Sequence, residues 1–252
     1  WYYIYWHTCD VCMISANVSA FSIGKAVGRR AVPSGPMSWQ YSGTSFSTTS
    51  QEISPTGITW DGTYFWVVGH QNKTAYKYNS SGVYQGVSFS VAAQSAYPHG
   101  IVWDGTNFWM VSGVQLHKYT AAGAFVSTYN LSNGGYVTGI TWDGAFLWLV
   151  NQTSDAVYKY NTSGVYQGVS FSVASQDTSP KGVTWDGTYF WMVGDVTNSV
   201  YKYNASGTYQ GVSFSAYAQA TSAQDLVSVG TDLWVTDYSS DAVYKYSYLP
   251  TP

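Results

Sequence analysis

Four aspartates in one repeated context are the first candidates for chemistry. They share the tripeptide Trp-Asp-Gly and follow one another at intervals of 43, 39 and 43 residues: Asp61, Asp104, Asp143 and Asp186. Carboxylates held together on a rigid scaffold can bind a divalent cation, which needs several oxygen ligands. However, no second acidic residue recurs beside these four, and Asp-Gly is a favoured sequence for a tight hairpin turn. We therefore expect turn residues and no metal site.

Catalytic groups are sparse in the rest of the chain. Glu52 is the only glutamate, although a glycosidase normally uses two carboxyl groups. The four histidines fall in different connections, and no Ser-His-Asp arrangement recurs with the repeat: His7, His70, His99 and His117. From this we expect no enzymatic activity and no cofactor.

A lysine recurs later in each copy of the same repeat. The five positions are Lys77, Lys118, Lys159, Lys202 and Lys245. Neighbouring strands lie about 4.8 Å apart, so a long lysine side chain can approach a turn aspartate of its own copy or of the next copy. We expect a repeated structural Asp–Lys ion pair. Lys245 has no such partner in its own copy, because Val229 replaces the aspartate there.

Asparagine occurs unusually often in the sequence Asn-x-Ser/Thr. The seven positions are Asn17, Asn72, Asn79, Asn130, Asn151, Asn161 and Asn204. Asparagine is also a preferred residue for opening a turn, and three of the seven share one repeat position. Two interpretations therefore stand: turn residues, or glycosylation sites if the source organism glycosylates asparagine.

Cys9 and Cys12 form a lone Cys-x-x-Cys motif. A zinc site needs two more ligands, and only His7 is close in sequence. A redox site normally comes with the start of a helix, which this segment does not show. A local disulfide and two free thiols remain as alternatives.

The composition excludes several classes of protein. Charged residues are 9% and aromatic residues 18% of the chain, and the net charge is −3 with only 10 Lys and Arg. Strong helix formers are scarce, and so few basic residues cannot form a nucleic-acid surface. The apolar amino-terminal segment is interrupted by His7, Asp10 and Asn17, so we expect no membrane span. A polar surface with so little charge is typical of extracellular proteins and particle surfaces.

A repeat of about 42 residues organises the chain. Residues 137–179 and 180–222 are identical at 24 of 43 positions without a gap. The first copy divides into four short strands, at 57–60, 64–68, 75–78 and 83–90, separated by turn sequences. Four-stranded antiparallel units of this length are typical of β-propeller blades. The nine tryptophans that recur with the repeat could stack on sugars, but we expect them to fill the core between the blades.

The ends of the repeat predict how the ring closes. The last copy lacks its fourth strand, and residues 41–47 match that strand in sequence. We therefore expect an all-β, five-bladed propeller with blades starting near residues 55, 98, 137, 180 and 223. An amino-terminal strand at 41–49 would complete the last blade and remove a free edge. The alternative is six blades. The propeller would span 41–249, with 1–40 as an arm and linker.

The Trp-Asp-Gly blades resemble NHL-like and lectin-like β-propellers. They resemble the repeats of uncharacterised phage and environmental proteins and, more distantly, five-bladed tachylectin-type lectins. The resemblance covers residues 41–249 and implies the propeller fold. Fold by itself does not decide function.

The connections that vary most between copies predict a ligand-binding face. The turns after the first and third strands barely change, whereas the other two sets of connections vary freely, and both variable sets lie on one face. Because recognition residues usually stand on loops of a rigid scaffold, we expect this face to bind a ligand, a glycan in the first place. The candidate residues are His70, Gln71, Asn72, His99, Asn151, Gln152, Asp195, Asp237 and Tyr238.

The amino-terminal segment predicts self-assembly. This short segment carries aromatic residues but is too short to form a hydrophobic core of its own: Trp1, Tyr2, Tyr3, Tyr5 and Trp6. We expect residues 1–32 to dock on a neighbouring subunit. The function expected from the sequence is a non-catalytic subunit of an extracellular assembly, either a virion appendage or a surface filament. Its partners would be copies of itself, other subunits and glycans. The alternative is a secreted multivalent lectin, and a propeller hydrolase is the third interpretation.

Overall fold

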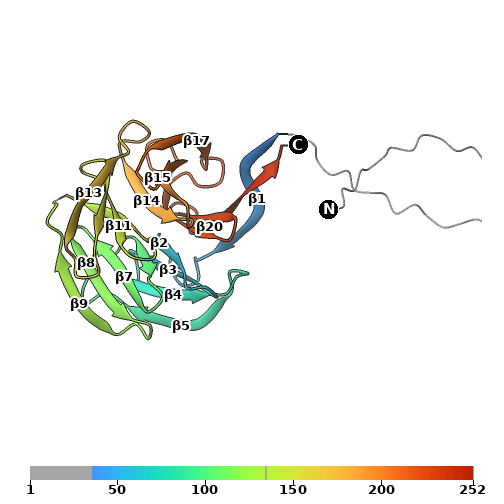
Figure 1. The fold of residues 1–252 in the computed structure, drawn as a ribbon. Helices are drawn as coiled ribbons and strands as arrows, with labels where there is room; N and C mark the ends of the chain where they lie inside the picture. Colours follow the sequence, from blue (N-terminus) through green and yellow to red (C-terminus); the bar gives the residue numbers. More distant parts are fainter. Residues whose placement is uncertain (1–35, 134, 252) are drawn as a thin grey trace, which may run out of the picture.

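The computed structural model describes residues 36–251 apart from residue 134, and this part of the chain forms 20 β-strands and no helix. The strands make five four-stranded antiparallel sheets arranged around an axis (Figure 1). The five-bladed propeller expected from the repeat is confirmed, and the six-bladed alternative is wrong. Since the described residues contain no helix, none of them forms a helix that could cross a membrane.

Each of the first four blades runs through its strands from the axis outward. The first blade has β2 (Pro55–Trp60), β3 (Phe65–Gly69), β4 (Thr74–Tyr78) and β5 (Tyr84–Ser90). The second has β6 (Ile101–Trp103), β7 (Asn107–Ser112), β8 (Gln115–Thr120) and β9 (Phe125–Asn130). The third has β10 (Val137–Trp142), β11 (Leu147–Asn151), β12 (Ala156–Tyr160) and β13 (Tyr166–Ser172). The fourth has β14 (Pro180–Trp185), β15 (Tyr189–Gly194), β16 (Ser199–Asn204) and β17 (Tyr209–Ser215).

The fifth blade joins the two ends of the propeller. It consists of β18 (Ala223–Val229), β19 (Asp232–Asp237), β20 (Ala242–Pro250) and β1 (Met37–Ser47). Strand β1 pairs antiparallel with β20, which confirms closure by an amino-terminal strand, although the strand begins at Met37 and not at residue 41. Here β1 and β20 continue as a two-stranded ribbon beyond the level at which the other blades turn (Figure 1).

The inner strands are buried on both faces, which is why their sequences lack strict alternation. A glycine lies against the next blade within three of them and directly before the fourth, β6: Gly57, Gly139, Gly182 and Gly100. A Cβ atom on Gly57 would lie 2.2 Å from the carbonyl oxygen of His99, so only glycine fits there. The fifth blade has Asp225 at this position, fully buried.

Aromatic side chains fill the wedge between neighbouring blades. The ring of Trp66 lies 4.9 Å from that of Phe108 in the next blade, and Trp148 lies 4.8 Å from Phe190. The second tryptophan of every copy is buried, as expected: Trp66, Trp109, Trp148, Trp191 and Trp234. The first tryptophan of each copy was also expected in the core, but it is only half-buried: Trp60, Trp103, Trp142 and Trp185.

Candidate ligand-binding pockets between the blades

The Trp-Asp-Gly motif forms the turn between the first two strands of a blade. Asp61 accepts hydrogen bonds at Oδ1 from the amides of Thr63 and Tyr64, at 2.9 and 2.8 Å. Its Oδ2 accepts the indole N–H of Trp66 at 2.8 Å. The same three bonds recur around Asp104, Asp143 and Asp186. The carboxylates therefore hold the turn and orient the buried tryptophan. Among the described residues no group of three or more His, Cys, Asp or Glu could hold a metal ion.

The recurring lysine lies over an aromatic ring and not beside the turn aspartate. The Nζ atom of Lys77 is 3.8 Å from the centre of the Tyr64 ring, and that of Lys202 is 3.7 Å from the Tyr189 ring. Such contacts contribute about 0.5–1 kcal/mol at exposed sites. The expected Asp–Lys pairing is therefore corrected, because the aspartate oxygens already bind the turn and the indole.

The fifth copy shows the same position with a different partner. Asp232 stands where the first copy has Tyr64, and its carboxylate pairs with Lys245 at 2.8 Å. Lys245 thus has a partner in its own copy after all. Within residues 36–251, the other ion pair joins Lys181 and Asp195 at 3.5 Å.

Two equivalent cavities lie between blades, on the face that carries the Asp-Gly turns. We name them pocket 1/2, of about 290 Å³, and pocket 3/4, of about 360 Å³. Pocket 1/2 is lined by Asp61, Thr63, Tyr64, Trp66, Lys77, Trp103, Phe108 and Ala121. Pocket 3/4 is lined by the corresponding Asp143, Ala145, Phe146, Trp148, Lys159, Trp185, Phe190 and Ala205.

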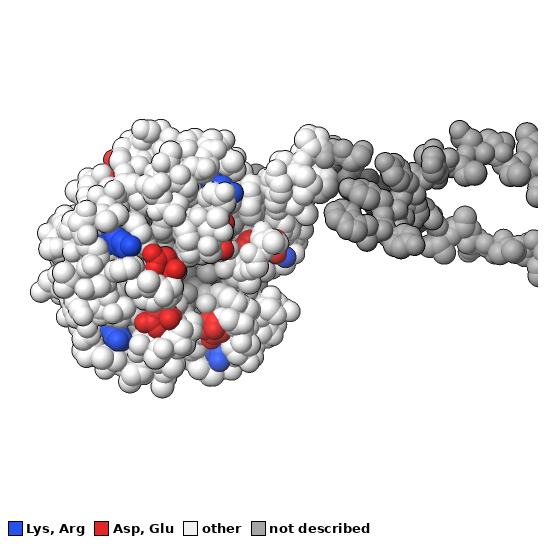
Figure 2. All heavy atoms as spheres, viewed as in Figure 1, with Lys and Arg blue, Asp and Glu red and all other residues white. Residues whose placement is uncertain are grey.

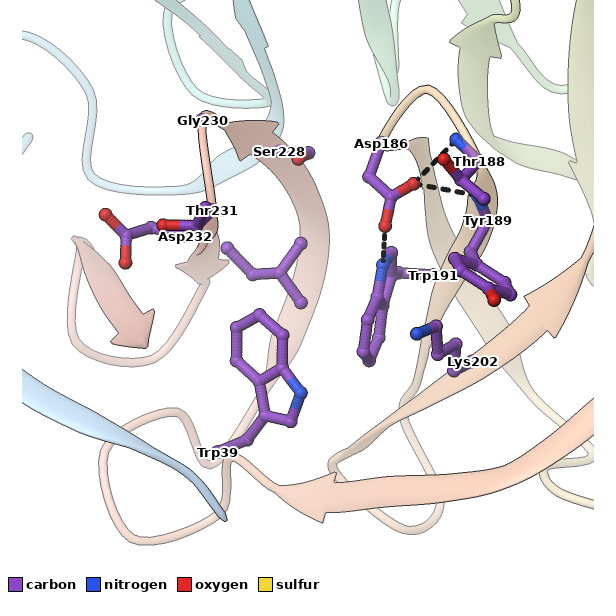
Figure 3. Close-up of a pocket in the computed structure, with 11 residues that line it drawn as sticks. Trp39, Asp186, Thr188, Tyr189, Trp191, Lys202, Ser228, Gly230, Thr231 and Asp232 are labelled. Atoms are coloured by element: carbon purple, nitrogen blue, oxygen red, sulfur yellow. Dashed lines mark hydrogen bonds between the residues drawn. The ribbon is translucent and has the colours of Figure 1, made fainter. Parts of the chain in front are cut away.

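The third cavity, pocket 4/5, is built differently. It measures about 290 Å³ and lies between the fourth and fifth blades, lined by Trp39, Asp186, Thr188, Tyr189, Trp191, Lys202, Ser228, Leu233 and residues 230–232. Figure 3 shows Trp39 and Trp191 next to each other in its wall, in an edge-to-face contact, with Lys202 beside Tyr189. A fourth cavity of about 310 Å³ adjoins it around Trp39, Trp191, Lys202, Val212 and Tyr248.

The pockets combine aromatic walls with both signs of charge. In the view of Figure 2, acidic side chains lie around the hollow middle of the disc and basic side chains lie farther out, while the periphery carries little charge. In each pocket the lysine amine can donate hydrogen bonds and the aspartate can accept them, and in pocket 1/2 the hydroxyls of Thr63 and Tyr64 add further donors. This arrangement suits a neutral, hydroxyl-rich ligand with one apolar face.

The residues expected from the variable loops lie on the opposite face, and none of them lines these four cavities. Some hold the loops together. Asp237 is fully buried and accepts hydrogen bonds from the amides of Ser222 and Ser240. Asn151 is 1% exposed and accepts from the amides of Thr153 and Ser154.

Other members of the expected set belong to the same loop framework. The backbone amides of Gln71 and Asn72 donate hydrogen bonds to the carboxylate of Glu52. This carboxylate is buried, and its burial raises the pKa of Glu52. Gln152 donates to the hydroxyl of Ser179 at 2.7 Å. Asp195 forms its ion pair with Lys181, as described above. The ligand contacts expected of this set stay a prediction.

His70 and His99 do come together on that face. Their rings lie 4.8 Å apart, and Nε2 of His99 is 2.7 Å from the hydroxyl of Tyr136. The ring of Tyr238 lies 6.1 Å from His70. Burial lowers the pKa of His99 to about 3, and burial together with Lys181 and Lys73 lowers the pKa of His70. Both imidazoles are therefore neutral at pH 7, and Nε2 of the neutral His99 ring can accept a hydrogen bond from the phenol of Tyr136.

The candidate glycosylation sites divide into two groups. Asn79, Asn161 and Asn204 accept amides of their own turns through Oδ1, which supports the turn interpretation. Asn72 and Asn130 are exposed, whereas Asn151 is buried. The expected assembly residues lie outside the described part of the chain, as do Cys9, Cys12, His7 and Asn17: Trp1, Tyr2, Tyr3, Tyr5 and Trp6.

Sequence reasoning missed the pockets because it assigned their walls to the core. Trp103 and Trp185 repeat so regularly that they were expected to be packing residues. A signal was nevertheless present: each stands at the end of an inner strand, next to a turn that opens on solvent. Trp39 gave no such signal, because it lies outside the repeat.

Comparison with known proteins identifies the fold. No protein-family model matches the sequence. No curated protein is similar to it in sequence. Among solved structures, glutaminyl cyclase from Myxococcus xanthus is similar, with a TM-score of 0.66 and 11% identity, over 86% of this chain and 98% of that one.

Two further structures have comparable coverage. The PQQ-bound aldose sugar dehydrogenase from Streptomyces coelicolor has a TM-score of 0.55 and 11% identity, over 86% of this chain and 99% of that one. Virginiamycin B lyase from Staphylococcus aureus has a TM-score of 0.53 and 15% identity, over 85% of this chain and 100% of that one.

These neighbours correct the expectation that the chain has no enzymatic activity. A cyclase, a dehydrogenase and a lyase share its fold, so the fold leaves catalysis open to this chain. The expectation rested on the absence of a carboxylate pair or a triad within the repeat, yet loops of different blades can bring catalytic groups together. At such low identity the similarity concerns architecture, and by its architecture the chain is a five-bladed β-propeller.

Proposed function

We propose that this protein is a multivalent saccharide-binding β-propeller that serves as a subunit of an extracellular assembly. The observation that carries the proposal is the recurrence of one pocket design between blades, with aromatic walls, a lysine and a turn aspartate. The resemblance of the repeats to lectin-like propellers supports the same function.

The chemistry of the pockets fits a sugar ring. A pyranose has an apolar face that packs on tryptophan or tyrosine, and its hydroxyls both donate and accept hydrogen bonds. In pocket 1/2 the half-buried Trp103 supplies an aromatic surface, while Lys77 and Thr63 supply polar contacts. Ligand pockets typically begin at about 300 Å³, which matches the size of these cavities and one sugar unit or two.

The two equivalent pockets and the related pocket 4/5 lie on one face and give multivalency. Each can be weak on its own, because simultaneous binding to a surface with many glycans raises the overall avidity by about 10²–10⁴. The low charge of the chain and its expected amino-terminal arm support the assembly part of the proposal. Electron micrographs of the full chain and its solution mass test that part.

A glycan array followed by calorimetry tests saccharide binding. We expect the full-length protein to bind a subset of saccharides, and Trp185→Ala to lower the number of sites per chain by removing pocket 3/4. The matched control is Tyr238→Ala, which removes an exposed aromatic side chain from the opposite face and should leave the number of sites unchanged.

Two results would contradict the proposal. One is an array without binding. The other is binding that Tyr238→Ala abolishes and Trp185→Ala leaves intact, because that result would place the site on the variable-loop face.

A further inference from the structure

Pocket 4/5 differs from the other pockets at the positions that the fifth blade contributes to its wall. Ser228 stands where Trp103 stands in pocket 1/2, and Leu233 replaces the phenylalanine. The turn alanine is absent, because the fifth blade has no turn between its outer strands, and Trp39 of β1 lines the pocket instead.

Trp39 fixes the end of the ring-closing strand against the fourth blade. Its ring stacks on Phe214 of β17 at 5.4 Å with an interplanar angle of 14°, and meets the edge of Trp191 at 4.9 Å. In the other blades, a turn glycine packs on the equivalent outer-strand ring, as Gly207 does on Phe171. Trp39 therefore replaces the missing turn as the contact between the outer parts of two blades.

The two cavities around Trp39 have part of their walls in common. Pocket 4/5 and the adjoining cavity share Trp39, Trp191 and Lys202, and together they offer more room than pocket 1/2. A ligand there would contact β1 on one side and the fourth blade on the other (Figure 3). In pockets 1/2 and 3/4 both walls come from blades that the continuous chain already joins.

Strand β1 is joined through the chain to the first blade, but it depends on non-covalent contacts for its place beside β20. It pairs with β20 at the opposite end of the chain, so opening the ring separates these two strands without strain in a connecting loop. A ligand that requires both walls of pocket 4/5 cannot stay bound when the first residues of β1 leave. Such a ligand must stabilise the closed ring by mass action.

We propose that pocket 4/5 is a ligand-operated clasp: an oligosaccharide of at least two sugar units, bound between Trp39 and Lys202, holds the ring-closing strand against the fourth blade. This inference rests on the proposed saccharide binding and adds a consequence that the other pockets do not share. Occupancy of pocket 4/5 controls the opening of the propeller.

Hydrogen exchange of the full chain tests the clasp. The amides of residues 39–41 and of their partners in 246–248 are measured with and without cellobiose, lactose or diacetylchitobiose. At a ligand concentration of 100 Kd for this pocket, exchange that requires opening of the strand should slow by about 100-fold.

Two matched variants separate the clasp from general binding. Lys202→Met removes the amine from pocket 4/5 without changing β1, and should abolish the slowing. Lys77→Met makes the same change in pocket 1/2 and should preserve it. These substitutions remove similar contacts with an aromatic ring, so their effects on folding should match.

The outcomes distinguish the two proposals. Slowing that persists in Lys202→Met overturns the clasp. Calorimetric binding of a disaccharide without any slowing in the unmodified chain also overturns the clasp, while saccharide binding stands. If none of the three disaccharides binds and the glycan array is also negative, both proposals fail.

Discussion

Asp225 occupies the inner-strand position that holds glycine in the other four blades. Its Oδ2 accepts the amide of Ile58 at 3.0 Å, while its buried Oδ1 has no hydrogen-bond partner. Burial raises the pKa of this carboxyl well above its usual range. The folded protein therefore favours the protonated acid, whereas the unfolded chain loses the proton near pH 4.

Asp225→Asn should stabilise the protein in a pH-dependent way. Above pH 4 the unfolded chain gains from ionising the carboxyl and the folded chain does not, so the unmodified protein loses about 1.4 kcal/mol per pH unit up to the folded pKa. Asparagine keeps an acceptor for Ile58 and carries no ionisable group. Urea unfolding at pH 3, 5 and 8 should show a benefit of the substitution that grows with pH.

The control for this prediction is an aspartate on the surface. Asp195→Asn removes a partly exposed partner of Lys181 and should change the free energy of unfolding by less than about 1 kcal/mol. A benefit of Asp225→Asn that is the same at pH 3 and pH 8 would show that the carboxyl is not protonated in the fold.

At the scale of elements, the hairpin between the first two strands is the unit that repeats best. The aspartate serves the turn through one oxygen and the buried tryptophan through the other, so a single side chain couples local geometry to the core. On the opposite face, buried carboxylates likewise accept hydrogen bonds from loop amides, but the carboxylate comes from a different part of the chain in each blade. Glu52 holds the loop of the first blade from a preceding connection, whereas Asp237 holds that of the fifth blade from the strand itself.

Asp143→Ala should weaken one such hairpin. The substitution leaves the indole N–H of Trp148 and the amides of Ala145 and Phe146 without their acceptor. An unmet buried donor costs about 1–3 kcal/mol, and the free energy of unfolding should fall by that amount. Asp143→Asn keeps one oxygen acceptor and should lose less. Equal stability of all three proteins in urea would contradict this role.

At the scale of the whole molecule, the chain carries little charge. Only 9% of the residues are charged and the net charge is −3, so electrostatic repulsion between copies is weak. The closed ring covers the otherwise open end of the last blade with β1. The proposed assembly therefore cannot add a strand to the last blade at this edge.

Deletion of residues 1–32 tests the proposed assembly arm. The shortened chain keeps all of β1, so its circular dichroism, its unfolding in urea and its saccharide binding should remain unchanged. The full chain should form oligomers in electron micrographs and by light scattering, and the shortened chain should be monomeric. A monomeric full chain, or oligomers that survive the deletion, would show that the arm does not drive assembly.

The sequence by itself determined the blade, the number of blades and the closing strand. These features follow from local signals: strands of alternating or continuous apolar residues, Asp-Gly and Asn-x-x-Gly turns, and a fixed interval between copies. Each copy carries the same signals, so the strands predicted in one copy agree with those predicted in the others. Even the match of residues 41–47 to the missing fourth strand is a comparison of short local sequences.

Only the tertiary structure decided where the pockets lie. Trp39 and Trp191 are 152 positions apart in the chain, and their rings come into contact only because the closing strand lies against the fourth blade. The tryptophans of the inner strands were expected in the core. Their residue type and regular spacing are the same in a packed wedge and in a pocket wall, so the sequence pattern does not separate the two. Exposure depends on what the next blade places opposite, and that is a property of the packing between blades, which no single repeat encodes.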